Sequence, residues 1–170
     1  IQQRADMAAA VCADLGYDNV GTLETLFASN GDMGFLEMNT RIQVEHGVTE
    51  AITGCDLIQL QIELAQGGEL PAQPTRHGFA MEVRLYAEDP ETLLPSTGRL
   101  SVFRPPQLHG VRVESGYQEG QQVTPHYDAM LAKLIAHAET RELAIGRLLV
   151  ALRAFEVVGV KTNAPLLMKI

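Results

Sequence analysis

The strictest pattern along the chain is an alternation of apolar and polar residues from Phe79 to Tyr86. Apolar side chains recur at every second position from Phe79 to Leu85, and Arg84 falls on the opposite face. Because successive side chains of a strand point to opposite faces, the pattern predicts a strand with one buried side. Shorter apolar runs, separated by Pro and Gly, predict further strands of a mostly antiparallel sheet. These strands are predicted at 100–103, 111–114, 130–136 and 157–160.

Three segments carry the signals of α-helices. Residues 5–15 are rich in Ala and other good helix formers. Residues 56–65 place apolar side chains at helical spacing, and Thr53 is the predicted N-cap. A third helix is predicted to start at Thr140 as its N-cap and to run through Phe155.

A β-hairpin is predicted near the start of the chain. The strand-like runs 20–27 and 33–38 flank an Asn-Gly pair at 30–31, which is the strongest short-range hairpin signal. Pairing of the two runs would bring Glu24 close to Glu37. The two carboxylates would then lie on neighbouring strands.

Two segments lack periodicity. The polar stretch 39–47 is expected to be a loop or an irregular strand, and 71–77, with two prolines, is interpreted as a connector. We therefore place a domain boundary there, which divides the chain into 1–70 and 71–170.

The composition is that of an ordinary globular protein, with 170 residues of which 46% are hydrophobic and 20% charged. A net charge of −8 argues against nucleic-acid binding, which needs clustered Lys and Arg. No apolar run is long enough to span a bilayer. Cys12 and Cys55 are interpreted as buried thiols of a reducing compartment. The first residue is not Met, so we expect a piece of a longer protein.

The hairpin carries the first group of candidate site residues. Glu37 and Asn39 share a strand face, and Glu24 can join them across the hairpin. Two carboxylates and an amide oxygen suit Mg²⁺ or Mn²⁺ when nucleotide phosphates supply the other ligands. The alternative is that these residues are solvated groups on a sheet face.

Arg41, Gln43 and Glu45 form the second group, because extended backbone would place them on one face. Arg and Gln donors could hold a small planar anion, and Glu45 could remove its proton. A surface Arg–Glu pair is the alternative. His46 could carry a proton or simply pack.

Arg84 could stabilise a developing oxyanion, or it could pair with Glu82 or Glu88 on the strand.

The segment "FLEMNTRIQVEH" at 35–46 resembles the core motif of biotin carboxylases. These are the ATP-grasp subunits or domains of acetyl-CoA, propionyl-CoA, methylcrotonyl-CoA, pyruvate and urea carboxylases. The resemblance continues in "FAMEVRLYAEDP", "LPSTGRLSVFRPP" and "GVKTNAPLL" and covers nearly the whole chain in the family's order. It implies an α+β architecture: 1–70 resemble the carboxy-terminal part of an ATP-grasp fold, an antiparallel sheet plus helices. Residues 71–170 resemble the mostly antiparallel carboxy-terminal domain of biotin carboxylase, truncated at its end.

The resemblance also implies roles for the candidate residues. It makes Glu24, Glu37 and Asn39 ligands of the metal and the ATP phosphates. Arg41 would bind bicarbonate and steady carboxyphosphate, with Gln43 and the backbone of Val44 completing the pocket. Glu45 would be the general base, and Arg84 would face the ureido group of biotin and stabilise its enolate. Gly47 departs from the family pattern, where Pro is usual, and the turn at 29–31 is one residue longer than in many relatives.

The implied reaction uses ATP, Mg²⁺ or Mn²⁺, and bicarbonate to carboxylate biotin on a carrier domain. The implied partners are that carrier domain, a carboxyltransferase and further copies of the enzyme, in the cytoplasm or, in a eukaryote, the mitochondrial matrix. The family's glycine-rich lid and phosphate-binding lysines would lie upstream of position 1, so the isolated chain is expected to be inactive. The rival interpretations are a carbamoyl-phosphate synthase-like ligase and an inactive structural fragment. The acyl acceptor belongs to another domain.

Overall fold

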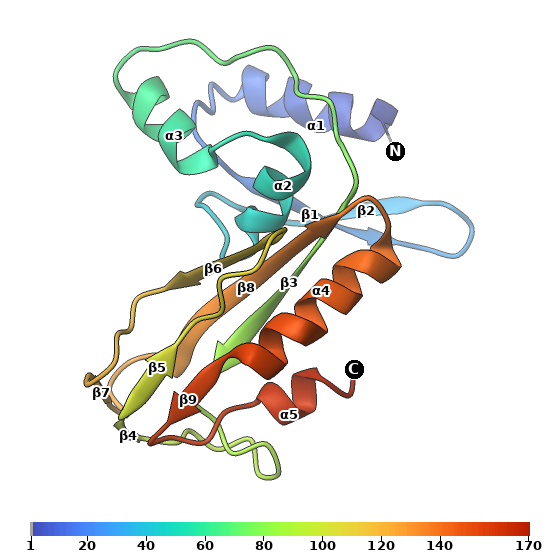
Figure 1. Ribbon diagram of the computed structural model, residues 1–170. Coiled ribbons are helices and arrows are strands. Elements are labelled where there is room, and N and C mark those ends of the chain that lie inside the picture. Colours follow the sequence, from blue (N-terminus) through green and yellow to red (C-terminus); the bar gives the residue numbers. More distant parts are fainter. Residues whose placement is uncertain (1) are drawn as a thin grey trace. The chain divides into compact units, whose positions relative to one another are not determined.

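The computed structural model describes residues 2–170, with side chains from Ala5 onward. The chain forms two compact units (Figure 1). The first contains Ile1–His46 and Gly54–Pro74, and the second contains Gly47–Thr53 and Thr75–Ile170. The second unit therefore takes a short segment from within the first part of the sequence.

The first unit contains the predicted hairpin and two of the predicted helices. The strands β1 (Thr22–Phe27) and β2 (Met33–Asn39) pair antiparallel, and the turn is closed by the N–H of Ala28, which donates to the Asp32 carbonyl at 2.9 Å. Gly31 in this turn has a φ of +89°, a conformation that glycine adopts without steric cost. The elements of this unit are α1 (Gln2–Asp14), β1 (Thr22–Phe27), β2 (Met33–Asn39) and α3 (Leu57–Ala65).

The N-cap of α3 is Asp56, and the prediction that Thr53 caps it is wrong. Asp56 Oδ1 accepts a hydrogen bond from the Gln59 N–H at 2.8 Å. Thr53 instead ends a helix that the sequence pattern did not predict, α2 (His46–Thr53), and its hydroxyl donates to the Thr49 carbonyl at 2.7 Å. The loop predicted at 39–47 therefore ends two residues early. Helix α2 has eight residues and few apolar positions. It therefore shows too little of the helical period to be recognised from the sequence.

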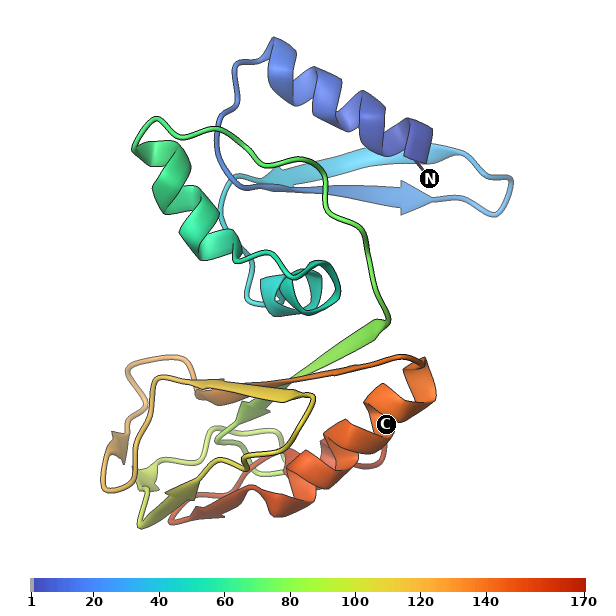
Figure 2. The ribbon, with the colours of Figure 1, turned by 45° about the horizontal axis from the view of Figure 1, so that its top comes forward.

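The second unit is built on a three-stranded antiparallel sheet with the strand order β3–β8–β6. These strands are β3 (Phe79–Tyr86), β8 (Met130–Ala138) and β6 (Val111–Ser115), close to the predicted ranges. Helix α4 (Arg141–Ala154) covers one face of the sheet (Figure 2). The buried core between them contains Leu85, Leu134, Ala136, Leu148, Ala151 and Leu152.

The N-cap of α4 is as predicted, since Thr140 Oγ1 accepts from the Leu143 N–H at 3.3 Å. Ala144, Leu148 and Leu152 of this helix are buried, and Phe155, where the helix was predicted to end, is half-buried just after its last residue. None of the helices among the described residues is both long and apolar enough to cross a membrane.

A second core lies at the other end of this unit, around Leu100, Phe103, Val123 and Leu131. Short strand pairs close it. The strand predicted at 100–103 begins two residues later, at Val102, and a two-residue strand at Gly98–Arg99 ends just before the predicted range. The pattern missed two strands of two residues each and a final one-turn helix, which are too short to show a period. These elements are β4 (Gly98–Arg99) paired with β7 (Gln122–Val123), β5 (Val102–Arg104) paired with β9 (Glu156–Val158), and α5 (Ala164–Leu167).

The two cysteines are less buried than expected. Within the described residues neither Cys12 nor Cys55 forms a disulfide, and both are partly accessible to solvent.

Candidate functional site

The hairpin of the first unit places Glu24 directly opposite Glu37. The two residues are Cα partners in the antiparallel pair, so their side chains lie on the same face. The register shifts immediately after Glu24, where Thr25 pairs with Phe35 and Leu36 is the extra residue. Such a bulge re-aims neighbouring side chains and is frequent beside active sites. The prediction that the hairpin joins Glu24 and Glu37 is confirmed at the level of strand pairing.

Two amide side chains converge on Glu24. Asn39 Nδ2 donates to Glu24 Oε1 at 2.7 Å, and Gln43 Nε2 approaches the same oxygen at 3.4 Å. All three side chains are half-buried, whereas Glu37 is exposed. The end of β2 and the loop after it thus form a polar cluster with β1, which we call the Glu24 cluster: Glu24, Glu37, Asn39 and Gln43.

The Glu24 cluster has a donor set that fits a hard divalent cation. It offers two carboxylates, and the Asn39 amide can rotate to present its oxygen in place of its nitrogen. Mg²⁺ takes about six oxygen ligands, so phosphates or water would have to complete the shell.

Arg41 and Glu45 lie in the loop between β2 and α2, and both are exposed. Arg41 Nη1 donates to the neighbouring Ile42 carbonyl at 3.1 Å. A tight turn follows, closed by the His46 N–H donating to the Gln43 carbonyl at 3.2 Å. Because this turn changes the chain direction, the prediction that Arg41, Gln43 and Glu45 share one face of extended backbone is wrong.

His46 starts α2 and its ring belongs to the same turn. Its Nδ1 lies 2.7 Å from the Gln43 carbonyl oxygen, which can only accept, so that nitrogen carries the proton. The contact fixes the orientation of the ring, and both interpretations of His46 stay predictions.

Arg84 lies in the middle of β3, in the second unit and on the sheet face opposite α4. Its Cα partner on β8 is Lys133, whose own partner on β6 is Glu114. The three side chains therefore form one row across the sheet. Lys133 is only 7% exposed, and its ammonium pairs with Glu114 at 3.0 Å. This pairing offsets the cost of placing two cations opposite each other.

The row extends into a network of alternating charges within the second unit. Arg112 Nε lies 3.0 Å from Glu114 Oε1, and Arg112 Nη2 lies 2.7 Å from Glu50 Oε2. Glu50 is on α2 and is 8% exposed. Sequence reasoning missed Glu50, Arg112, Glu114 and Lys133, because their proximity depends on the register of three strands that are distant in the sequence.

A second ionic feature follows β3 in the chain. Asp89 pairs with Lys161, whose hydrogen bond holds the pKa of the carboxyl below its ordinary value of 3.8. The backbone N–H of Glu91 adds to this effect, and the same carboxylate raises the pKa of Lys161. The Lys161 side chain is exposed and the Asp89 side chain is partly covered, so the pair tethers a loop rather than forming a buried site.

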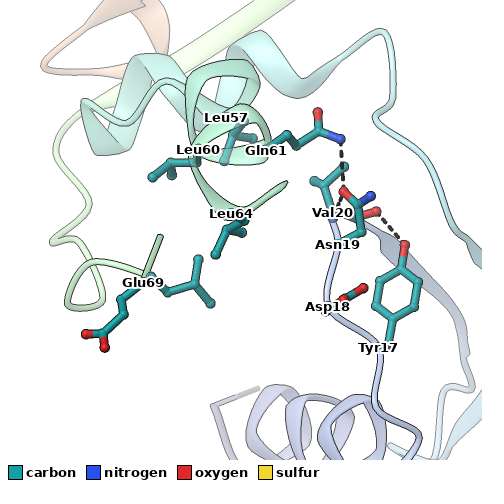
Figure 3. A pocket seen from close by; sticks show the side chains of 10 residues that line it. Tyr17, Asp18, Asn19, Val20, Leu57, Leu60, Gln61, Leu64 and Glu69 are labelled. Carbon is teal, nitrogen blue, oxygen red and sulfur yellow. Dashed lines mark hydrogen bonds between the residues drawn. The ribbon is translucent and has the colours of Figure 1, made fainter. Parts of the chain in front are cut away.

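An apolar pocket of about 400 Å³ lies elsewhere in the first unit (Figure 3). The loop around Asn19 forms one wall and α3 forms the other, with Gln61 Nε2 donating to Asn19 Oδ1 at 3.1 Å. The Tyr17 hydroxyl donates to the Val20 carbonyl at 2.7 Å. None of the predicted site residues lines this pocket, so the predicted chemistry does not depend on it.

Two known protein families match the chain, one in each part and in the order that the sequence resemblance predicts. Residues 82–170 match the family described as biotin carboxylase C-terminal domain. Residues 2–73 match the family described as carbamoyl-phosphate synthase L chain, ATP binding domain.

Individual relatives agree with the family matches. The chain is 47% identical over 167 residues to a biotin carboxylase of Halalkalibacterium halodurans, covering 96% of this chain and 37% of that protein. It is 42% identical over 172 residues to the mitochondrial propionyl-CoA carboxylase alpha chain of Caenorhabditis elegans, covering 98% of this chain and 24% of that protein.

Among solved structures, the chain resembles the biotin carboxylase domain of 2-oxoglutarate carboxylase from Hydrogenobacter thermophilus. The TM-score is 0.92 at 40% identity, over 99% of this chain and 39% of that one. That domain is a dimer in complex with MgADP, ADP and bicarbonate. The chain thus spans less than two fifths of the length of each of these three relatives.

Proposed function

Because the chain belongs to the biotin carboxylase family, we propose that it supplies part of the active site of an ATP-dependent biotin carboxylase. We call the full-length protein expected to contain the chain the parent enzyme. The observation that carries the proposal is the Glu24 cluster, in which two opposed carboxylates and two amides meet at the end of a hairpin. The binding of MgADP and bicarbonate by the related 2-oxoglutarate carboxylase domain supports it.

The Glu24 cluster would hold Mg²⁺ or Mn²⁺ together with the phosphates of ATP. Glu24, Glu37 and Asn39 are the proposed ligands, and a bound cation would neutralise phosphate charge during transfer. Asn39 and Glu24 lie within hydrogen-bond distance of each other, so one ion could reach both once the amide turns its oxygen toward it. Glu37 is exposed and can turn toward it.

The loop after β2 would bind bicarbonate. The planar guanidinium of Arg41 suits a planar oxyanion, and its exposed position lets it move onto the ligand. Gln43 and the backbone of Val44 would complete the site. Glu45 would take the proton of bicarbonate, whose oxygen then attacks the γ-phosphorus of ATP, and the bond to ADP breaks to leave carboxyphosphate.

Arg84 would act in the second step, on biotin. When the ureido nitrogen loses its proton, negative charge develops on the ureido oxygen, and a guanidinium beside that oxygen stabilises it. The nitrogen then takes the carboxyl group as its bond to the phosphate of carboxyphosphate breaks, and the departing phosphate takes up the ureido proton and is released. Arg84 lies on a sheet strand, in one row with Lys133 and its partner Glu114. Such a position on a rigid element suits a group that must be preorganised.

The partners of the parent enzyme follow from this chemistry. Biotin would arrive on a carrier domain, and carboxybiotin would leave to a carboxyltransferase. Self-association is proposed by analogy with the dimer of the related domain. Two of the relatives belong to carboxylases with different acceptors, propionyl-CoA and 2-oxoglutarate. We therefore propose that other domains of the parent enzyme select the final acceptor.

A carbamoyl-phosphate synthase-like ligase is the second candidate. The match of 2–73 to an ATP-binding family named for that enzyme favours it, because such an enzyme also phosphorylates bicarbonate. The match of 82–170 to the biotin carboxylase C-terminal domain weighs against it. Formation of carboxybiotin from free biotin, with no ammonia-dependent product, would decide between them.

The experiment that tests the metal and phosphate site is Glu37→Gln in the parent enzyme. Removing one anionic ligand should lower metal-dependent, bicarbonate-dependent ATP cleavage by about a hundredfold or more, as for other losses of transition-state charge stabilisation. Glu63→Gln makes the same chemical change at an exposed residue of α3 and should leave turnover unchanged. Normal ATP cleavage by Glu37→Gln would rule out the assignment.

A further inference from the structure

Asn163 is a buried polar residue whose side chain does not serve the helix that it precedes. It is 7% exposed and is the N-cap residue of α5, yet its side chain makes no capping hydrogen bond. Asn at this position commonly accepts a hydrogen bond from the first turn of the helix. Here the amide is engaged elsewhere.

The Asn163 amide binds the backbone of β3 on both sides of Leu85. Its Nδ2 donates to the Arg84 carbonyl at 3.1 Å, and its Oδ1 accepts from the Tyr86 N–H at 2.9 Å. The backbone N–H of Asn163 also donates to the Tyr86 carbonyl at 3.2 Å. One residue thus holds three backbone groups of β3, as a neighbouring strand would.

This part of β3 needs such support for two reasons. β3 is at the edge of its sheet, so one row of its backbone groups has no strand neighbour. The register between β3 and β8 also shifts between Leu85 and Tyr86, which interrupts the ladder beside Arg84. The segment that carries Arg84 is therefore held by β8 on one side and by Asn163 on the other.

We infer that Asn163 is a positioning residue for Arg84 in the transfer of the carboxyl group to biotin. The inference rests on the proposed function of Arg84. Asn163 fixes the backbone from which the guanidinium projects, and a displacement of about 1 Å at a catalytic group can lower a rate roughly a hundredfold. ATP cleavage, which Arg84 does not serve, should be insensitive to that displacement.

The test measures phosphate release and carboxybiotin formation in parallel in the parent enzyme. Asn163→Ala should lower the ratio of carboxybiotin to phosphate by roughly ten- to a hundredfold, with phosphate release changed by less than about twofold. Asn163→Asp keeps an acceptor for the Tyr86 N–H but has no donor for the Arg84 carbonyl, so it should also lower the ratio. Its retained bond makes it the variant of choice if Asn163→Ala does not fold.

Ser96→Ala is the matched control. The Ser96 hydroxyl accepts from the Lys161 N–H at 2.9 Å, so it tethers the same segment to a loop rather than to β3. This variant should leave the ratio unchanged. A ratio lowered as strongly as by Asn163→Ala would show that any loosening of the segment suffices, and would overturn the inference.

The double variant Arg84→Ala/Asn163→Ala shows whether Asn163 acts through Arg84. Once Arg84 is removed, loss of Asn163 should add little, whereas additive losses would overturn the inference. Equal loss of both signals in Asn163→Ala and Asn163→Asp would do the same.

Failure of the proposed function would look different. A parent enzyme without bicarbonate-dependent ATP cleavage contradicts that function itself. A normal ratio in Arg84→Ala contradicts the role of Arg84 and, with it, the inference about Asn163. A low ratio in Arg84→Ala with a normal ratio in Asn163→Ala contradicts the inference alone.

Discussion

The two units of the chain differ in how they bury apolar side chains. Among the described residues, all buried hydrophobic side chains belong to the second unit, and they lie between Leu85 and Leu152. In the first unit α3 has no buried residue, and large apolar side chains are exposed: Met7, Leu15, Leu26, Phe27 and Phe35 are 61–76% exposed. Because apolar burial is the main driving force of folding, we expect the second unit to be the more stable of the two. Exposed apolar surface of the kind seen on the first unit is typical of interaction surfaces.

The largest expected effect tests this contrast in core stability. In the 170-residue chain, Leu134→Ala should lower the free energy of unfolding of the second unit by about 2–5 kcal/mol, since Leu134 is fully buried. Leu26→Ala removes the same atoms from a side chain that is 61% exposed and should change stability by less than about 0.5 kcal/mol. Hydrogen exchange during urea titration measures both, with the amides of β8 and β1 as reporters. Equal destabilisation by the two variants would remove the contrast.

The next effect compares one arginine from each unit. Arg41 is on an exposed loop of the first unit and Arg84 is on the sheet of the second. In the parent enzyme Arg41→Ala should impair both ATP cleavage and biotin carboxylation. Arg84→Ala should impair carboxylation far more, by about 3–4 kcal/mol in the barrier or roughly a hundred- to a thousandfold, because its anion develops only in the second step. Parallel assays of phosphate and carboxybiotin check this, and equal losses in Arg84→Ala would refute the division of roles.

A smaller effect tests whether buried charge also supports the second unit. Arg112→Met removes the guanidinium that lies 2.7 Å from the buried Glu50 carboxylate. We expect a loss of about 1 kcal/mol, at the low end for a charged partner because the Arg112 side chain is 44% exposed and screened by solvent.

Arg104→Met is the control for this measurement. Arg104 pairs with Glu156 and Glu119 at the surface and is 65% exposed, so its loss should be within about 0.5 kcal/mol. Urea denaturation of the chain separates the two variants. If they behave alike, the buried network is not a source of stability.

The smallest effect concerns the surface pair of Asp89 and Lys161. Because the folded-state pKa of Asp89 is lowered, its contribution to stability is present above the unfolded value of 3.8 and is lost as the pH falls through the lower folded value. Lys161→Met should return the pKa of Asp89 toward 3.8 and flatten the acid limb of the stability profile. An NMR titration of the Asp89 carboxyl provides the measurement, and an unchanged pKa in the variant would contradict the assigned cause.

Local signals in the sequence were sufficient for the hairpin and for most of the longer elements. The Asn-Gly pair at 30–31 and the strand runs on either side of it need only neighbouring residues, so the opposition of Glu24 and Glu37 could be predicted. The same holds for the alternation in β3 and for the N-cap Thr140, whose hydrogen bond lies within one turn. The resemblance supplied the roles proposed for these residues, which spacing alone left open.

The sequence by itself thus determined the two-strand frame of the Glu24 cluster, the strand that carries Arg84 and the family of the chain. Only the tertiary structure decided what surrounds Arg84: Lys133 opposite it, Glu114 beyond, and Asn163 along its edge. It also turned the loop before His46 into a tight turn and placed Thr53 at the end of a helix. The physical reason is that strand register and edge contacts are set by packing of the whole core, and no local pattern records which distant residues that packing brings together.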